Sequence, residues 1–460
     1  MQTTITSNSI FMAVGVVATA ALLTKPPTSL TKLWTKAKYL VQAYATEILS
    51  HSTLFRREVP FPGDESISPL WVTKFLRNSG VLDERNSVIK VTIEDLQGNR
   101  GLAGVLSRLR LTYSSEAGTD LPATLILKMS PSGINGRRSA IAAGQYREAI
   151  FYEELGAQCH PFIPKIYFTY GSAVTGTCII VMEDLIENQE SVGVNMLFGN
   201  QIWGVENPWE DAPEQVEVLK EMFMFAAELH AKYWNDHSLL NSKWIKSAGW
   251  YKGMDRAKWE LAIDTGRSSW EKLKVAIADG SSGVKWSPKF IKVLDASYAA
   301  TSWAHLQEHL NDRKIPFTLC HGDFHAGNMI WLKNEPTNHL RVVDWSEVGV
   351  WEPTADLGQT IISDVKASIW RDNDVKLLRL YWEKLVSLGV SAEEYPFDMC
   401  LERYERAPVE RWIWVFSLMS TFGLPPIAIQ YFHDQILSFI EAHGDHDAYI
   451  LKPVVCLVLQ

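Results

Sequence analysis

The chain has 460 residues, of which 47% are hydrophobic and 21% charged, and this balance excludes an intrinsically disordered protein. Its length is sufficient for two hydrophobic cores. The formal net charge of −9 argues against a nucleic acid or an anionic membrane as the main partner, and five scattered cysteines without metal-ligand spacing indicate reduced thiols in a cytoplasmic compartment.

An uncharged apolar run at residues 10–23 is the first feature of the chain. It is shorter than the roughly 20 residues of a comfortable membrane span, and no basic residue precedes it, whereas a cleaved signal peptide has one. Three interpretations stay open: a membrane anchor, a buried or mobile helix, and an uncleaved targeting segment. An anchor would leave the rest of the chain in the cytoplasm, because lysines follow the run. Residues 25–58 predict a linker that leads into an amphipathic helix.

The globular part begins near Leu70, where apolar spacing predicts a helix that ends at Gly80. Residues 87–95 then alternate between apolar and polar side chains, which predicts a strand. A glycine-rich stretch at residues 98–107 lies between two strand-like runs. Backbone N–H groups of such a turn, including that of Gly101, can contact phosphate oxygens. An ordinary hairpin is the alternative, because glycines spaced three apart do not match Gly-x-Gly-x-x-Gly.

Residues 121–129 predict a strand with Lys128 near its end, and residues 147–155 predict a helix that contains Glu148. A lysine that ends an apolar run is usually an edge residue whose ammonium reaches solvent. A strand lysine paired with a helix glutamate is instead the arrangement by which kinases hold nucleotide phosphates. The sequence therefore makes Lys128 a candidate phosphate anchor.

Two further strands are predicted, and the chain then becomes mainly helical. Residues 188–213 form a long polar connection, and no internal repeat or low-complexity tract follows. The predicted strands cover residues 164–170 and 177–185, and the predicted helices cover residues 213–234, 255–277, 288–310, 374–388, 397–420 and 427–443.

Two apolar runs of strand character, within residues 319–331 and 340–345, each carry a short polar cluster. Together they present Asp323, Asn328 and Asp344. Phosphoryl transfer needs this set: a carboxylate that orients and deprotonates the attacking hydroxyl, and an amide oxygen and a second carboxylate that hold Mg²⁺ on the nucleotide phosphates. We therefore expect Asp323 to be the catalytic base, and Asn328 and Asp344 to be the metal ligands.

The pattern His-Gly-Asp-x-x-x-x-Asn, followed by two apolar residues and Asp-Trp, resembles the aminoglycoside phosphotransferase and choline kinase group of small-molecule kinases. Among the branches of this group, the pattern is most similar to that of the ecdysteroid-kinase-like branch. The resemblance implies an α+β, two-lobed protein-kinase-like fold with ATP and Mg²⁺ between the lobes. After an N-terminal segment and linker at residues 1–45, the implied lobes are a small strand-rich N-lobe at residues 46–186 and a larger helical C-lobe at residues 187–460.

The same resemblance assigns roles outside the central motif. Glu148 matches the glutamate that positions the phosphate-binding lysine, here Lys128. Met182, Glu183 and Asp184 match the segment that joins the lobes, where the backbone would hydrogen-bond an adenine. Asp184 could equally serve in a capped turn at the end of a strand.

These residues together predict transfer of the γ-phosphate of ATP to a hydroxyl of a small molecule, whose identity the sequence leaves open. Asp356 would steady the catalytic loop as its counterpart does in the family, His321 would order that loop by hydrogen bonding, and His325 could face the acceptor. A protein kinase fits less well, because only a short stretch separates Asp344 from Asp356 and no Ala-Pro-Glu element follows. The alternative function is a catalytically inactive, membrane-tethered pseudokinase that binds nucleotide or acts as a scaffold.

Overall fold

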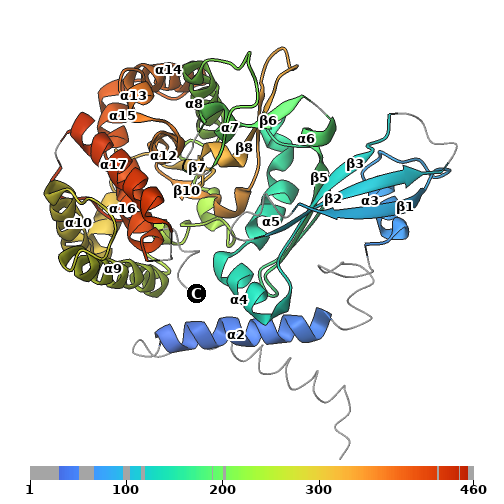
Figure 1. Ribbon diagram of the computed structural model, residues 1–460, viewed down its shortest axis with the longest axis horizontal. Helices are drawn as coiled ribbons and strands as arrows, with labels where there is room; N and C mark the ends of the chain where they lie inside the picture. The colour runs from blue at the N-terminus through green and yellow to red at the C-terminus, as the bar shows by residue number, and fades with distance from the viewer. Residues whose placement is uncertain are drawn as a thin grey trace, which may run out of the picture. The chain divides into compact units, whose positions relative to one another are not determined.

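The computed structural model describes residues 31–50, 67–96, 104–114, 120–188, 190–199, 202, 204–421, 424–444 and 446–453. The chain forms two compact units, the first within residues 1–160 and 164–189, and the second within residues 161–163 and 190–458. The first unit contains a five-stranded sheet with helices beside it, and the second unit is mainly helical (Figure 1). The predicted α+β class, with a small strand-rich lobe and a larger helical lobe, is confirmed.

The first unit is built on a five-stranded antiparallel sheet with the strand order β1-β2-β3-β5-β4. Its interior is apolar, and six of the seven residues of β5 are buried, as expected of a strand that is covered on both faces. The strands that the sequence predicts in this region are therefore present. The five strands are β1 (Val88–Asp95), β2 (Val105–Tyr113), β3 (Thr124–Met129), β4 (Ile166–Ser172) and β5 (Thr177–Glu183).

The core of the first unit lies between this sheet and α3 (Pro69–Asn78). Val72, Phe75 and Leu76 follow the spacing of one helix face and pack against buried leucines of β2 and β3. Ser68 begins the helix, because its hydroxyl accepts a hydrogen bond at 3.2 Å from the backbone N–H three residues later. The helix predicted near Leu70 is confirmed.

Besides the four-residue α6 (Leu185–Asn188), three more α-helices of the described chain belong to this unit. α5 (Tyr146–Glu154) contacts β4 and β5, and α4 (Gly133–Ala143) contacts α2 (Thr31–Ser50), which runs beside it (Figure 1). Gln42 and Thr46 of α2 donate hydrogen bonds to backbone oxygens of the turn between β4 and β5. The sequence does not predict α4, because this segment, which contains two glycines and two arginines, lacks an apolar stripe of helical spacing.

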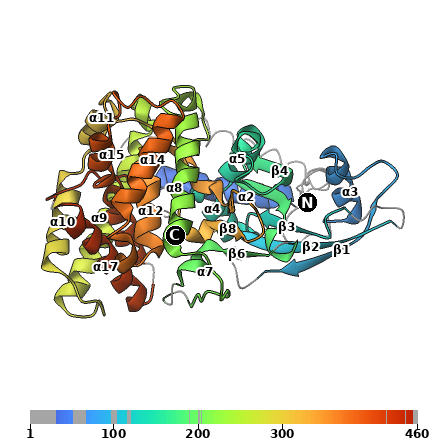
Figure 2. The same ribbon diagram turned by 90° about the horizontal axis from the view of Figure 1, so that it is seen from above.

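The second unit consists mostly of helices, with two small antiparallel sheets among them (Figures 1 and 2). The sheets are β7–β10 and β6-β8-β9, and α12 packs against α16. The strands are β6 (Ser191–Gly193), β7 (Thr318–Cys320), β8 (Met329–Leu332), β9 (Leu340–Val342) and β10 (Gly349–Trp351), and the helices are α7 (Val194–Phe198), α8 (Gln215–Lys232), α9 (Arg256–Ala278), α10 (Pro288–Ala300), α11 (Trp303–Leu310), α12 (Thr354–Asp364), α13 (Ala367–Trp370), α14 (Asp374–Ser387), α15 (Phe397–Tyr404), α16 (Ala407–Met419) and α17 (Pro426–Ala442).

Two helices that the sequence predicts as continuous are interrupted. Residues 288–310 form α10 and α11, and Ser302 starts the second helix by accepting a hydrogen bond from His305 N at 3.2 Å. Residues 397–420 form α15 and α16, and Pro408 lies in the first turn of α16, where the missing N–H of proline breaks no helix bond. The prediction of single helices is wrong at both places, because the apolar periodicity continues across each break.

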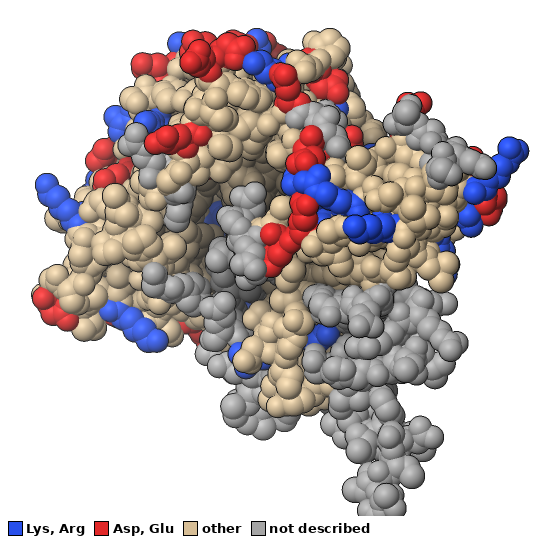
Figure 3. Space-filling model, turned by 45° about the vertical axis from the view of Figure 1, so that its right-hand side comes forward, with Lys and Arg blue, Asp and Glu red and all other residues tan. Residues whose placement is uncertain are grey.

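Two predictions fall outside the described residues: the apolar run at residues 10–23 and the phosphate contact of Gly101. No helix in the described part of the chain combines the length and the apolar character that a bilayer crossing requires. On the face drawn in Figure 3, acidic and basic side chains of the described residues are interspersed rather than gathered by sign. This face therefore presents a mixed surface instead of an extended basic one.

Candidate active site

The segment between β7 and β8, residues 321–328, carries two of the predicted catalytic residues and is called the catalytic loop below. It ends in a 3-10 turn, Ala326–Asn328, directly before β8. The side chain of Asn328 turns back over the loop, and its Nδ2 donates to the backbone oxygen of Asp323 at 3.0 Å and to Oδ2 of Asp323 at 3.2 Å. The loop therefore brings Asp323 and Asn328 together and leaves the amide oxygen of Asn328 as the atom that can face a cation.

Asp344 lies next to the catalytic loop through strand pairing. β8 and β9 are antiparallel, and Val343 N donates to Asn328 O at 2.9 Å. Asp344 follows with a φ of 61°, in the left-handed region that is uncommon for residues other than glycine. Its Oδ1 accepts a hydrogen bond from Ser346 Oγ at 2.9 Å. The two predicted metal ligands thus come from neighbouring ends of two paired strands.

One face of α12 holds the catalytic loop in place. Four of its side chains, at spacings that share one side of a helix, bond to the loop. Asp356 accepts two backbone N–H groups of the loop, from His321 at 2.8 Å and from Gly322 at 3.1 Å, which is the steadying role that the resemblance implies. The other contacts are Gln359 Nε2 to Asp323 Oδ1 at 2.6 Å, Thr360 Oγ1 to Phe324 O at 2.7 Å and Ala326 N to Asp364 Oδ2 at 2.9 Å.

His321 is fully buried and links the two acidic segments. Its Nδ1 accepts the backbone N–H of Asp323 at 3.2 Å, and its Nε2 lies 3.0 Å from the carbonyl oxygen of Val343. Since a carbonyl only accepts, this arrangement requires a neutral ring with its proton on Nε2. Burial lowers the pKa of His321, against the opposing effect of nearby carboxylates. These contacts fit the predicted role of ordering the loop.

Asp323 is surrounded by positive charge. Arg411 Nη2 lies 3.8 Å from its Oδ1, and His325 Nε2 lies 3.5 Å from its Oδ2. Burial would raise the pKa of Asp323, but the charges of His325 and Arg411 hold that pKa well below its usual range. Burial would likewise lower the pKa of His325, but the Asp323 carboxylate raises it to about 9. At neutral pH the site therefore presents an ionised carboxylate, which can accept a hydrogen bond from a hydroxyl.

Gln359 and Arg411 contact Asp323 but are not among the residues that the sequence predicts. Gln359 lies three positions after Asp356 and so on the same helix face, which could have identified it. Arg411 follows Glu410, and these two charged residues stand next to each other in an otherwise mostly apolar helix. Charged residues in an apolar helix indicate buried polar interactions, although the sequence does not identify their partners.

In the first unit the structure pairs the predicted phosphate anchor, Lys128, with the glutamate predicted to position it. Lys128 Nζ lies 2.5 Å from Glu148 Oε2, and the Glu148 side chain is 1% exposed. Lys128 belongs to β3, which lies inside the sheet between β2 and β5. It is therefore not an edge lysine that reaches solvent, and a glutamate buried this deeply requires a cationic partner.

Met182, Glu183 and Asp184, the residues predicted to join the lobes, differ in their contacts. Asp184 is fully buried: its Oδ2 lies 2.6 Å from Arg108 Nε, and its Oδ1 accepts a hydrogen bond from Glu187 N at 3.1 Å in α6 (Leu185–Asn188). Its side chain thus belongs to the capped turn that was the alternative interpretation. Glu183 N donates to the backbone oxygen of Lys165, directly before β4, at 2.9 Å. The adenine contact by the backbone of Met182 to Asp184 stays a prediction.

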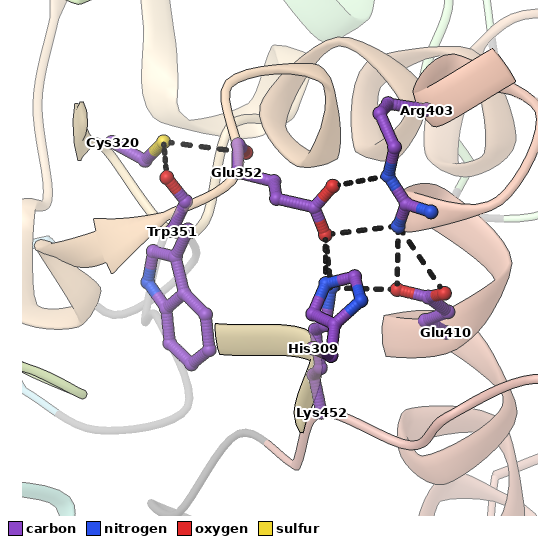
Figure 4. Close-up of polar contacts among 7 residues, drawn as sticks. All are labelled: His309, Cys320, Trp351, Glu352, Arg403, Glu410 and Lys452. Carbon is purple, nitrogen blue, oxygen red and sulfur yellow. Dashed lines mark hydrogen bonds and ion pairs between the residues drawn. The ribbon is translucent and has the colours of Figure 1, made fainter. Parts of the chain in front are cut away.

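Two other groups in the described part of the chain have the ligand types of a metal site. In the first, of His230, Cys320 and Asp356, the carboxylate already binds the catalytic loop. In the second, of His309, Glu352 and Glu410, the ammonium of Lys452 contacts all three side chains (Figure 4). Asn328 and Asp344 therefore fit a divalent ion better, because oxygen ligands are those that Mg²⁺ prefers.

Solved structures of small-molecule kinases match this chain at low identity. A choline kinase from Cryptosporidium parvum Iowa II is 9% identical, with a TM-score of 0.46 over 82% of this chain and 95% of that chain. An ethanolamine kinase from Plasmodium vivax is 11% identical, with a TM-score of 0.39 over 87% and 93%. The aminoglycoside 2'-phosphotransferase-IIIa, in its GDP complex, is 11% identical, with a TM-score of 0.38 over 82% and 98%. No curated protein sequence matches this chain.

The family described as the phosphotransferase enzyme family matches residues 147–385, which is more than half of the chain. The match begins just before Glu148 and includes the catalytic loop, Asp344 and α12. It confirms the suspected group and the two-lobed, kinase-like fold, while the ecdysteroid-kinase-like branch stays a prediction. The chain belongs to the phosphotransferase enzyme family.

Proposed function

We propose that this chain is an ATP- and Mg²⁺-dependent kinase that transfers the γ-phosphoryl group to a hydroxyl of a small molecule. The observation that carries the proposal is the catalytic loop itself. The Asn328 amide donates two hydrogen bonds to Asp323, whose carboxylate is ionised, and Asp344 follows the neighbouring strand β9. Family membership supports the same class of reaction.

In the proposed reaction, Asp323 accepts a hydrogen bond from the acceptor hydroxyl and orients its oxygen toward the γ-phosphorus. The oxygen–phosphorus bond forms as the bond from that phosphorus to the bridging oxygen of ADP breaks, and the hydroxyl proton passes to Asp323. Asn328 and Asp344 would hold Mg²⁺, which when bound neutralises charge on the phosphates. Lys128, set by Glu148, would hold the α- and β-phosphates.

The test is ADP release by the full chain with a panel of hydroxylated metabolites, combined with nucleotide binding. Asp323→Asn should lower kcat by about 10²–10⁴-fold, the usual contribution of a general base. Its affinity for ATP should stay within about twofold of wild type, because the base does not hold the nucleotide. The matched control is Asp312→Asn, which changes an exposed aspartate of the same unit and should leave kcat unchanged.

The alternative, a pseudokinase, makes a different prediction in the same assay. It would bind ATP, but wild type and Asp323→Asn would release ADP at the same background rate with every acceptor. That result, obtained with Mg²⁺ present and with folded protein, would exclude the kinase. Removal of Mg²⁺ by a chelator should abolish wild-type turnover, and its return should restore it.

A further inference from the structure

Arg411 is a buried cation without hydrogen bonds. Its residue surface is 7% exposed, in α16, yet the guanidinium makes no hydrogen bond to any described residue. Asp323 Oδ1, at 3.8 Å from Nη2, is too far for one. The charge of Asp356 also acts on Arg411, but the Asp356 oxygens take the backbone N–H groups of the catalytic loop. A guanidinium carries five N–H donors, and those of Arg411, in a side chain that is 8% exposed, are left for a ligand or water to accept.

Gln359 has a second unused group at the same place. Its Nε2 donates to Asp323 Oδ1 at 2.6 Å, while its Oε1 is buried and has no hydrogen-bond partner within the described ranges. Arg411 and Gln359 therefore both lie at Oδ1 of Asp323, and each has hydrogen-bonding groups that no described residue uses. Asn328 and His325 contact the other oxygen, Oδ2. Arg411 thus lies at the carboxylate oxygen that does not contact Asn328, the proposed metal ligand.

We propose that Arg411 and Gln359 form the acceptor-binding element of this site, and that the acceptor is a hydroxy acid whose carboxylate binds Arg411. This inference rests on the proposed kinase function. The planar guanidinium matches the two oxygens of a carboxylate. Gln359 Oε1 accepts a hydrogen bond from a hydroxyl of the same molecule. The hydroxyl that meets Asp323 lies close to the carboxylate in the acceptor, because Arg411 and the base are neighbours.

Two other occupants fit less well. A cationic acceptor would place its charge beside Arg411 and beside His325, whose pKa is raised to about 9 by Asp323 although burial acts against it. The γ-phosphoryl group is an anion too, but it must approach the metal ligands, and Asn328 lies at Oδ2 rather than at Oδ1. The chemistry at Arg411 therefore favours an anionic group of the acceptor.

The test uses hydroxy acids of several skeletons, each with its primary amide and its amine analogue, and measures ATP-dependent phosphate gain by mass spectrometry. Wild type should favour each accepted acid over its amide by about 10²-fold in kcat/KM, the range for a charge-assisted bidentate pair. Arg411→Met should bring that ratio close to one, and Arg411→Lys should recover part of it. The control Arg256→Met alters an exposed arginine of the same unit and should keep the wild-type ratio.

The possible results separate this inference from the proposed function. Transfer to amides or amines in preference to acids, with equal losses for all three in Arg411→Met, overturns the inference and leaves the kinase intact. A loss in Arg411→Met that is equal for every acceptor and for ATP hydrolysis assigns Arg411 to the γ-phosphoryl group and also overturns it. Absence of transfer to every acceptor overturns both.

A binding measurement on wild-type protein avoids the risk that Arg411→Met fails to fold. With Mg²⁺ and a non-hydrolysable ATP analogue, calorimetry on the full chain should show that the acid binds about 10²-fold more tightly than its amide. Equal affinities for the acid and the amide would contradict carboxylate recognition.

Discussion

At the residue scale, His321 shows how a side chain that takes no part in the proposed chemistry can position two that do. Its ring accepts the N–H of Asp323 and donates to the carbonyl of Val343, directly before Asp344. One buried imidazole thus sets the spacing between the segment of the base and the segment of a metal ligand. A polar group left without a partner on burial costs about 1–3 kcal/mol.

We expect His321→Leu to lower the free energy of unfolding by about 2–4 kcal/mol, because two backbone groups lose their partner. It should also lower kcat by about 10²-fold through displacement of the loop. His321→Gln should recover most of kcat, since an amide accepts and donates at once. Urea unfolding and steady-state kinetics measure both quantities. If Gln were as inactive as Leu, His321 would be a proton carrier rather than a positioning residue.

The pH dependence of the same pair of proteins gives a second readout. Because burial lowers the pKa of His321 below its ordinary value, folding favours the neutral ring. Its contribution to stability is complete above about pH 6.5 and is lost as the pH falls through the folded pKa. Wild type should therefore lose stability relative to His321→Gln as the pH is lowered from about 7.5 to about 5. A constant difference over this range would contradict the neutral tautomer.

The motif residues were predictable because a short pattern encodes them. Asp323 and Asn328 lie on one loop, and Asp344 ends the neighbouring strand, so the arrangement of all three follows from one strand pair. Their catalytic roles stay predictions until activity is measured. Arg411 was not predictable, because its contact with Asp323 depends on how α16 packs against α12. No local pattern in the sequence reports that packing.

At the element scale, the catalytic loop passes very close to the chain that follows Asp344. Gly322 has a φ of +80°, and a Cβ atom built on it would lie 2.1 Å from the backbone oxygen of Glu347. Backbone cannot move away as a flexible side chain can, so only glycine fits here. The antiparallel pair of β7 and β10 imposes this approach, because the two strands flank it.

Gly322→Ala should therefore displace the loop and lower kcat by about 10²-fold or more, as small misplacements of reacting groups do. The matched control is Gly280→Ala, since Gly280 has a φ of +77° and a Cβ atom added there would meet nothing within 4 Å. The control should lose about 1 kcal/mol of stability from the left-handed backbone and keep its kcat. Kinetics and thermal unfolding of both proteins separate the clash from the backbone strain. Equal behaviour of the two variants would show that the close approach is unimportant.

Elements were predictable where their pattern is long. α8 and α9 each cover nearly the predicted residues, because several turns of apolar spacing identify them. β7 and β9 overlap the two apolar runs that the sequence predicts, whereas the three-residue strands β6 and β10 carry too few residues for a pattern. β6 and β10 form because each pairs with a strand that is distant in the sequence, β6 with β8 and β10 with β7. Such pairing is a property of the fold rather than of the segment.

At the scale of the whole molecule, a buried ionic network ties the end of the described chain to the helical unit (Figure 4). Lys452 contacts Glu352 and lies 2.6 Å from Glu410 Oε2 and 2.9 Å from His309 Nε2. Arg403 Nε is 2.5 Å from Glu352 Oε1. The network has two carboxylates and two permanent cations, so its charges balance. Its members come from five separate places in the sequence, which no local pattern could connect.

Lys452→Met should lower the free energy of unfolding of the second unit by about 3–5 kcal/mol, the usual effect of removing one partner of a buried ion pair. The control Lys292→Met, at a lysine whose side chain is 78% exposed, should change it by less than about 0.5 kcal/mol. Urea unfolding followed by tryptophan fluorescence measures both variants at pH 7. If the two variants were equally stable there, the network would not hold the carboxyl-terminal segment.

The pH dependence of this loss follows from the two glutamates. Burial would raise the pKa of Glu352, but Arg403 and Lys452 hold it well below its usual range, and Lys452 and Arg403 act on Glu410 in the same direction. Carboxylates with lowered pKa values stabilise the fold above about pH 4.5, and this contribution is lost as the pH falls through the folded pKa. In Lys452→Met one cation is gone, so the folded pKa values rise and less of this stability remains to be lost. The difference between wild type and Lys452→Met should therefore be largest near neutral pH and shrink as acid protonates the glutamates, whereas a difference that grows toward low pH would contradict an ionic origin.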